Sequence, residues 1–236
     1  MSAPRPAPAA APAVLPPKST AREYFESIVI AVILALFVRT WCFQAFKIPT
    51  GSMENNLLIG DHLVVNKFLF APAGFERGVL PIRDFRRGDV VVFKWPGGPE
   101  RDFIKRVIGL PGETVELRHK KVYINGTALE EPYVHYLLPP RADGEVTAYD
   151  KRETYAPVTV PDGQLFVMGD NRDNSEDSRY WGFLPQTYVK GRAVMVYWSF
   201  ESDAADYERP GIEQLFSMVT GFFTKTRWSR LGDQIR

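Results

Sequence analysis

Three parts of this sequence could do chemistry together, and the first of them is a serine. Ser52 lies in the stretch IPTGSMENNLLIGD, between a glycine and a methionine. A serine becomes a nucleophile only when a base removes its proton, and histidine is the usual base. The nearest histidine, His62, begins a strand-like run and has no recognisable residue to orient it. Taken alone, the stretch is more simply a turn, because Pro and Gly punctuate chains.

A lysine is the alternative base, provided that its surroundings favour the neutral amine. The stretch DFIKRVIGLPGE is strand-like, and on a strand Phe103, Lys105 and Val107 share one face. Apolar neighbours disfavour the charged ammonium and make the amine available. A single strand lysine more often protects a sheet edge from aggregation. Both interpretations of Lys105 stay open on these residues alone.

The third part is the acidic block MGDNRDNSEDSRYWGFLP. Its acids suggest a calcium loop, but Arg172 and Ser178 occupy positions where such a loop needs an oxygen ligand and a glycine. A loop fixed by charge-assisted hydrogen bonds fits these residues better. The pairs to choose from join Asp173 or Asp177 to Arg172 or Arg179, and the loop would present Ser175 or Ser178. The simpler alternative is a polar turn between two strands.

The composition of the 236 residues excludes several kinds of protein. Lys plus Arg is 29 and Asp plus Glu is 28, so nothing in the charge predicts binding to nucleic acid. The single cysteine, Cys42, excludes an intrachain disulfide framework and a cysteine-rich zinc site. The three histidines form no HExxH pair. We therefore expect no metal and no other cofactor.

The beginning of the chain predicts a tail followed by a membrane anchor. Residues 1–20 are rich in Ala and Pro, which favours an extended or disordered tail. Residues 21–46 contain the uninterrupted apolar run Ile28–Val38, with Tyr24 and Trp41 at its ends. A buried core helix or a cleavable signal peptide are the alternatives. No small-residue cleavage site follows the run, which favours a retained anchor.

Beyond the anchor, residues 47–206 predict a mainly β domain. Short runs rich in Val, Ile and aromatic residues are bounded by Gly, Pro and Asp, which is typical of strands. The pair Asn125 and Gly126 predicts a tight hairpin turn. Residues 131–157 have few periodic runs and predict an insertion or an extended hairpin. Residues 207–236 predict an amphipathic segment and the end of the domain, with membrane contact and core packing equally open.

Together, the sequence blocks resemble one known family. PTGSM, RRGDVVVFKWP, FIKRVIGLPGE and GDNRDNSEDSRYWG occur in the order of the sequence boxes of bacterial type I signal peptidases, and TRWSRLG extends the match more weakly. Four blocks in this order are specific, whereas GSM alone is not. The resemblance implies a membrane-anchored, largely antiparallel β fold that carries a Ser-Lys dyad serine endopeptidase.

The resemblance also implies roles for particular residues. Ser52 matches the nucleophile and Lys105 the general base, while Thr50 and the Ser52 amide match the oxyanion hole. Ser175 matches the hydroxyl that orients the lysine, and Asp177 and Arg179 match a supporting ion pair. The positions that match the pockets for the substrate residues before the cut are Phe46, Ile48, Pro49, Met53, Leu57, Phe103 and Ile104. The family usually reads SMxPT, whereas this chain has Asn55 and Asn56, a change that we expect to loosen the turn.

The same resemblance implies where the protein works and on what. The substrates would be exported preproteins, cut after small residues, and the other partner would be membrane lipid. The catalytic domain would lie on the outer, periplasmic side of the bacterial inner (plasma) membrane. Two rival hypotheses are a self-cleaving repressor-like Ser-Lys protein and a catalytically silent, membrane-tethered β module. The predicted anchor and the balanced charge oppose the first, and the presence of both Ser52 and Lys105 opposes the second.

Overall fold

The computed structural model describes residues 19–70, 82–98, 100–138, 150–202 and 211–235, without the side chains of residues 212 and 214–216. The chain divides into two compact units, residues 1–39 and 40–236. Nearly all of the predicted Ala/Pro-rich tail lies outside the described residues. The predicted C-terminal segment is described only from Gly211 onward.

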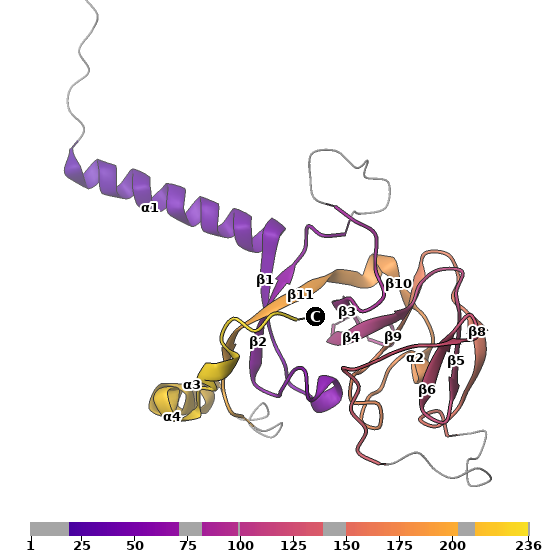
Figure 1. Ribbon diagram of the computed structural model, residues 1–236. Helices are drawn as coiled ribbons and strands as arrows, with labels where there is room; N and C mark the ends of the chain where they lie inside the picture. Colours follow the sequence, from indigo (N-terminus) through magenta and orange to yellow (C-terminus); the bar gives the residue numbers. More distant parts are fainter. Residues whose placement is uncertain (1–18, 71–81, 99, 139–149, 203–210, 236) are drawn as a thin grey trace, which may run out of the picture. The chain divides into compact units, whose positions relative to one another are not determined.

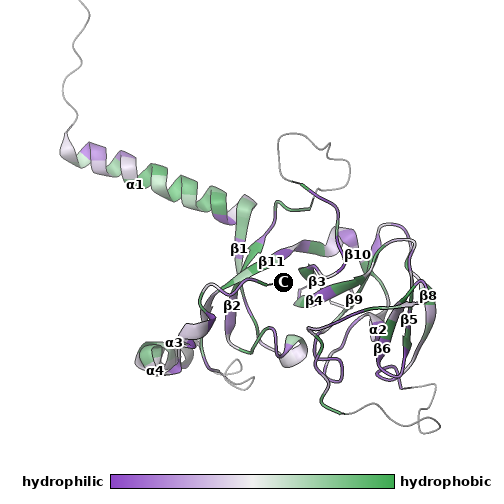
Figure 2. Ribbon diagram, in the orientation of Figure 1, coloured by the Kyte–Doolittle hydropathy of each residue, from purple (hydrophilic) through white to green (hydrophobic). Residues whose placement is uncertain are grey.

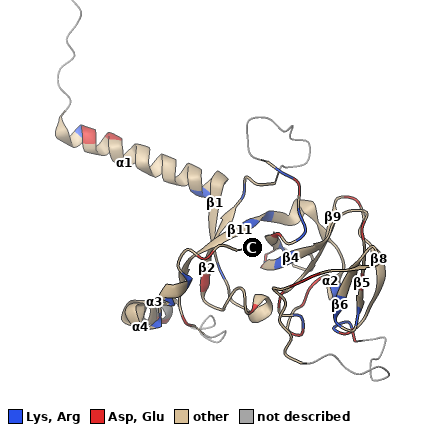
Figure 3. Ribbon diagram, viewed as in Figure 1, with Lys and Arg blue, Asp and Glu red and all other residues tan. Residues whose placement is uncertain are grey.

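The first described element is the apolar helix α1 (Thr20–Phe37), coloured green over most of its length in Figure 2. Ser19 caps its N-terminus, since its Oγ accepts a hydrogen bond from the Arg22 amide at 3.4 Å. A π-helical turn (Val38–Cys42) continues α1. The charged residues of α1 all lie toward its N-terminus (Figure 3). The 23 residues Thr20–Cys42 are long enough and apolar enough to cross a bilayer.

The helical segment ends earlier than the predicted anchor. Residues 43–46 were predicted to belong to the anchor, but they lie in strand β1 (Phe43–Lys47). This strand pairs antiparallel with β2 (Asp61–Asn66), with Phe43 opposite Asn66 and Lys47 opposite His62. The hydrogen bonds of this ladder satisfy the backbone that a helix would otherwise satisfy internally.

Within the described residues, seven strands form one antiparallel sheet, in the order β1-β2-β11-β3-β4-β9-β10 (Figure 1). The mainly β, antiparallel fold class is therefore confirmed. Strand β4 has β3 and β9 as its two neighbours, which makes it an interior strand. The remaining strands and the two short helices of this region are β3 (Val90–Lys94), β4 (Asp102–Gly109), β9 (Gln164–Met168), α2 (Ser178–Trp181), β10 (Leu184–Pro185), a 3-10 turn (Gln186–Tyr188) and β11 (Val189–Ser199).

A smaller antiparallel sheet has the order β7-β6-β5-β8. Asn125 and Gly126 form the two-residue turn between β6 and β7, with φ values of 50° and 80°, as the sequence predicts. Strand β8 overlaps the end of the predicted insertion 131–157, whose residues 139–149 are outside the described part. Its sequence, YAPVT, shows little alternation of apolar and polar residues and contains a proline. Proline is tolerated there because β8 is an edge strand. The strands are β5 (Thr114–Arg118), β6 (Lys121–Ile124), β7 (Thr127–Ala128) and β8 (Tyr155–Thr159).

The C-terminal residues return to the larger sheet. After α3 (Gly211–Thr220), α4 (Phe222–Lys225) and a 3-10 turn (Trp228–Arg230), residues 232–235 run beside β11. The amide of Ile235 donates to Val194 O at 2.9 Å, and the amide of Val196 donates to Asp233 O at 2.9 Å. Ile235 is buried in an apolar cluster with residues of β2, β3 and β11. Ile235 is thus part of the core of the larger sheet.

Candidate active site

The loop that carries Ser52 connects β1 to β2. Its ends meet, because the Ile48 amide donates to Asp61 O at 2.9 Å and the Gly60 amide donates to Ile48 O at 3.0 Å. Gly60 has a φ of +90°, and a β-carbon there would collide with Phe200 O. Ser52 itself lies buried in a 3-10 turn (Gly51–Met53). The hydrogen bonds that close this loop fix the position of Ser52 relative to the sheet.

Lys105 lies in the interior strand β4 and points at the serine. Its Nζ donates a hydrogen bond to Ser52 Oγ at 2.6 Å, and the Lys105 side chain is buried. The Phe103 ring lies 5.5 Å from the same Nζ. Burial lowers the pKa of Lys105 from 10.5 to about 8, against the opposing effect of Asp177. A lysine in this state is deprotonated often enough near neutral pH to act as a base.

The loop 169–177 packs directly on the Ser52 turn. The Asn171 amide donates to Ser52 O at 3.1 Å, and Asn171 Nδ2 donates to Gly51 O at 3.2 Å. A β-carbon on Gly169 would collide with Ser52 O and with Ser175 Oγ. Gly169 therefore allows the backbone of this loop, the Ser175 hydroxyl and the Ser52 carbonyl to approach one another closely.

Asp177 and Arg179 form a buried ion pair at the end of this loop. Arg179 Nε and Nη2 both donate to the Asp177 carboxylate at 2.8 Å, and the Gly169 amide donates to it at 3.1 Å. Burial alone would raise the pKa of Asp177, but Arg179 and these hydrogen bonds hold it below its ordinary value. Asp173 and Arg172 make other pairs, with Lys120 and Glu131. Ser178 accepts a hydrogen bond from the Val167 amide, so it is a structural residue.

The residues that match substrate pockets fall into two groups. Ile48, Met53, Leu57 and Ile104 are buried in one apolar cluster, and Phe46 packs against it. Phe103 instead lies against a second cluster, where its ring stacks on Trp95 with centroids 5.4 Å apart. Pro49 and Thr50 are exposed at the mouth of the Ser52 loop. The Thr50 hydroxyl makes no capping bond to the turn that follows.

His62 is engaged elsewhere, on strand β2. Its ring stacks on Trp198 with centroids 4.8 Å apart and meets Tyr197 edge-on at 5.8 Å. Burial, with a contribution from Lys47, lowers the pKa of His62 to about 4. The geometry therefore places a lysine, and not this histidine, beside the serine.

Sequence reasoning missed a set of buried ion pairs behind the site. Arg106 donates to Asp170 at 2.6 and 2.8 Å, Arg172 donates to Glu131 at 2.5 and 2.9 Å, and Lys120 donates to Asp173 at 2.7 Å. They join β4, the segment 131–138 and the smaller sheet to the loop 169–177. The sequence shows the charged residues, but the two members of each pair lie far apart along the chain. No local spacing indicates which charges meet.

Comparison with known proteins places this site in a family. A family model described as signal peptidase, peptidase S26, matches residues 21–198. A probable signal peptidase I-2 from Synechocystis is 40% identical over 188 residues, covering 78% of this chain and 76% of its own. Signal peptidase I from Pseudomonas aeruginosa is 35% identical over 225 residues, covering 80% and 78%.

A crystal structure of a signal peptidase I from Enterococcus faecalis is 38% identical, with a TM-score of 0.38, and covers 47% of this chain and 97% of that one. A further relative, signal peptidase I S from Bacillus subtilis, is 36% identical over 185 residues and is covered to 92%. The family model and these curated relatives span most of the chain, and the residues matched by the model include Ser52, Lys105 and the loop 169–177. The chain therefore belongs to the signal peptidase family, peptidase S26, as a type I enzyme.

Proposed function

We propose that this chain is a membrane-anchored serine endopeptidase that removes N-terminal signal peptides from exported preproteins with a Ser-Lys dyad. The observation that carries the proposal is the buried 2.6 Å hydrogen bond between Lys105 Nζ and Ser52 Oγ. A nucleophile and a base within this distance are the minimum for activation of a hydroxyl. The family supplies the substrate class, since its relatives are named signal peptidase I.

The proposed reaction begins with the neutral amine of Lys105. It accepts the Ser52 proton as Oγ attacks the scissile carbonyl, which gives a tetrahedral oxyanion and an ammonium. The Ser52 amide and the Thr50 hydroxyl donate to that oxyanion. The ammonium then returns its proton to the leaving amine, so that the C–N bond breaks and an acyl-enzyme remains. Water, deprotonated by the same lysine, hydrolyses the ester and restores Ser52.

The loop 169–177 has a supporting role in this proposal. Ser175 orients the Lys105 amine, and the ion pair of Asp177 and Arg179 holds the loop. Gly169 supports this assignment, because only a glycine leaves room for Ser175 beside the Ser52 carbonyl. Asp177 also raises the pKa of Lys105, so the ion pair moderates the effect of burial. No metal or cofactor takes part in the proposed steps.

Specificity for small residues before the cut rests on the apolar side chains around Ser52. The positions proposed to contact the substrate are Phe46, Ile48, Pro49, Met53, Leu57, Phe103 and Ile104. Four of these, Ile48, Met53, Leu57 and Ile104, are already packed into the core. A surface made from the outer edges of buried side chains can accept a methyl group but leaves little depth for a larger one.

Membrane anchoring by residues 20–42 is the second part of the proposal. The length and hydropathy of this segment support it. Lys18 and Arg22 precede the apolar run, which favours a cytoplasmic N-terminus and a catalytic domain on the outer side of the plasma membrane. In the unit 40–236, Phe222, Phe223 and Trp228 are exposed and pack ring against ring, an arrangement suited to a lipid interface.

Cleavage of a preprotein by the detergent-solubilised full chain tests the reaction. We expect cleavage after a small residue and its loss in Ser52→Ala, while His62→Ala stays active because His62 is engaged with Trp198. Activity that survives Ser52→Ala, or that disappears in a folded His62→Ala, refutes the dyad. Protease added to spheroplasts tests the orientation, because it should digest the chain beyond Lys47. Protection until the membrane is lysed would contradict the proposed side.

A further inference from the structure

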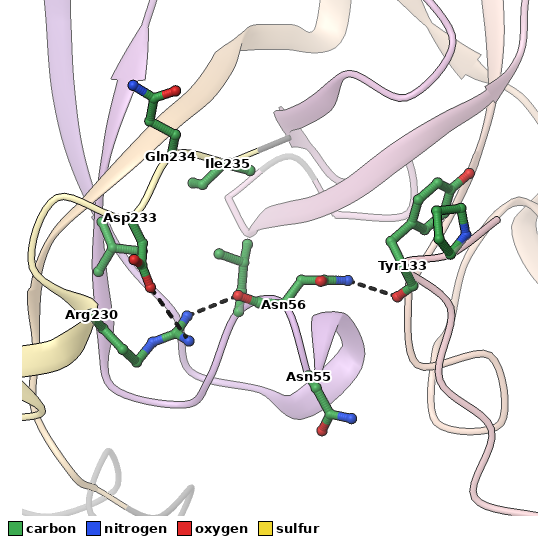
Figure 4. Close-up of a pocket in the computed structure, with 10 residues that line it drawn as sticks. Asn55, Asn56, Tyr133, Arg230, Asp233, Gln234 and Ile235 are labelled. Atoms are coloured by element: carbon green, nitrogen blue, oxygen red, sulfur yellow. Dashed lines mark hydrogen bonds and ion pairs between the residues drawn. The ribbon is translucent and has the colours of Figure 1, made fainter.

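Asn56, four residues after the nucleophile, is held on two sides although its side chain is largely exposed. Its Nδ2 group donates both hydrogens, to Tyr133 O at 2.7 Å and to Asp170 Oδ2 at 2.8 Å. The main-chain carbonyl oxygen of Asn56 accepts a hydrogen bond from Arg230 Nη2 at 2.8 Å. Figure 4 shows Asn56 between Tyr133 and Arg230, while the side chain of Asn55 points away from both. One residue thus joins three distant parts of the chain.

The side-chain contact of Asn56 leads to the strand that carries Lys105. Asp170 is fully buried and accepts two hydrogen bonds from Arg106, which directly follows Lys105 in β4. The Arg106 guanidinium also stacks on the Tyr133 ring at 4.0 Å. On the other side of Asp170, the Asn171 amide holds the Ser52 carbonyl at 3.1 Å. Asp170 is therefore linked to both members of the dyad. It bonds to the residue that follows Lys105, and the residue that follows Asp170 bonds to Ser52.

The main-chain contact of Asn56 leads to the C-terminal segment. Arg230 Nη2 also donates to Asp61 Oδ2 at 2.7 Å, and Nε donates to Asp61 Oδ1 at 3.2 Å. Asp61 is the buried first residue of β2 and accepts from the Leu58 amide at 2.8 Å, so it holds the end of the same loop. The guanidinium thus fixes the loop at Asn56 O and at Asp61, with its charge balanced by the carboxylate.

Packing alone leaves this side of the loop unsupported. A cavity of about 470 Å³ lies against it, lined by residues that include Asn56, Leu57, Tyr133, Arg230 and Ile235. Met53 and Leu57 anchor the loop in the core on its other side, but no side chain of the described residues packs against Asn56 where it borders the cavity. The hydrogen bonds of Asn56 therefore carry the restraint that close packing supplies elsewhere.

We propose that Asn56 is a positioning residue, whose amide ties the nucleophile loop to the Asp170–Arg106 pair and so holds Ser52 in register with Lys105. This inference rests on the proposed function. Asn56 and Asn55 stand where the family usually has threonine and proline, a change expected to loosen the turn. A threonine hydroxyl offers one hydrogen, whereas the Asn56 amide offers two and bonds two acceptors at once. The loop is tied by hydrogen bonds in place of the missing proline.

The test uses three variants of the detergent-solubilised full chain, with kcat and KM for a preprotein measured separately. Asn56→Ala should lower kcat about tenfold and leave KM unchanged, because a hydrogen bond to a charged group is lost and Ser52 shifts. Asn56→Asp should lower kcat further, since a carboxylate would face Asp170. Asn56→Thr should recover part of the loss, as one donor returns. The matched control, Asn55→Ala, should keep the kcat of the parent chain.

Thermal unfolding of the same variants separates positioning from folding. Asn56 is exposed, so each variant should remain folded at the assay temperature. A parental kcat in Asn56→Ala, an equal loss in Asn55→Ala, or a loss of activity that matches a loss of folded protein overturns the inference. None of these outcomes tests the proposed Ser-Lys dyad. Failure of the proposed function would appear separately, as activity that survives Ser52→Ala.

Discussion

Replacing Lys105 by methionine should abolish cleavage and at the same time stabilise the folded chain. The folded state lowers the pKa of Lys105 from 10.5 to about 8, because the ammonium loses its hydration on burial. Below pH 8 the lysine is protonated in both folded and unfolded chains, and the folded state bears the full cost. A fall of this size corresponds to roughly 3 kcal/mol, since one pH unit is worth about 1.4 kcal/mol.

Methionine removes that cost and fills nearly the same volume with apolar atoms. The hydrogen bond to Ser52 is also lost, which subtracts about 1 kcal/mol. We therefore expect the free energy of unfolding of Lys105→Met at pH 7 to be about 2 kcal/mol higher than that of the parent.

The sign of the pH dependence follows from linkage. Between pH 8 and 10.5 the unfolded chain binds the proton more tightly than the folded chain, so the parent gains stability as pH rises. The advantage of the methionine variant should therefore shrink through this window and vanish by about pH 10.

Denaturant unfolding of the full chain in detergent at pH 7 and pH 10 measures both values. Lys94→Met is the matched control, because Lys94 lies exposed at the end of β3 and its ammonium stays in water. A Lys105→Met variant that is less stable than the parent at pH 7, or whose advantage does not change with pH, would refute the claim that burial depresses this pKa. Retained turnover would refute its role as the base.

Three further predictions concern turnover. Thr50→Val should lower kcat about a hundredfold without unfolding the chain, as expected for the loss of one oxyanion donor, while Thr50→Ser stays active; equal rates for Val and Thr would remove Thr50 from the mechanism. The kcat/KM of the parent should rise about tenfold per pH unit up to about pH 8 and then level off, because only neutral Lys105 is a base; a profile that falls across this range would contradict the assignment. Gly169→Ala should lower kcat by displacing Ser52 and Ser175, and a parental rate would show that the loop adjusts freely.

Much of the fold follows from local sequence. The runs DHLVVNKF and DFIKRVIGL predict strands, and β2 and β4 are found there. β2 alternates between buried and half-buried residues, whereas β4 is an interior strand whose last six residues are all buried. The face that Lys105 shares with Phe103 follows from the same period. The hairpin at Asn125 follows from turn chemistry. Roles assigned through the family resemblance, such as those of Thr50 and Ser175, remain predictions.

What the sequence could not predict depends on distant partners. β2 and β3 are consecutive in the chain but are separated in the sheet by β11, and no local pattern indicates this. The edge strand β8 was hidden by its proline and polar residues. Asp173 was considered as a partner of the nearby arginines, whereas Lys120 reaches it from the smaller sheet. The fold decides which charged residues meet, so the residues next to Asp173 in the sequence do not indicate its partner.

The position of β11 has a consequence for the order in which the protein can be made. Strand β11 lies between β2 and β3, and the part of it that extends beyond β3 is hydrogen-bonded to residues 232–235. Translation delivers β2 and β3 long before β11, their shared neighbour, so the larger sheet cannot join these two strands until β11 has left the ribosome. Arg230, which fixes the loop of Ser52, arrives at the same late moment. A nascent chain that ends before β11 and Arg230 therefore lacks both a central strand of the larger sheet and the side chain that fixes the loop of Ser52.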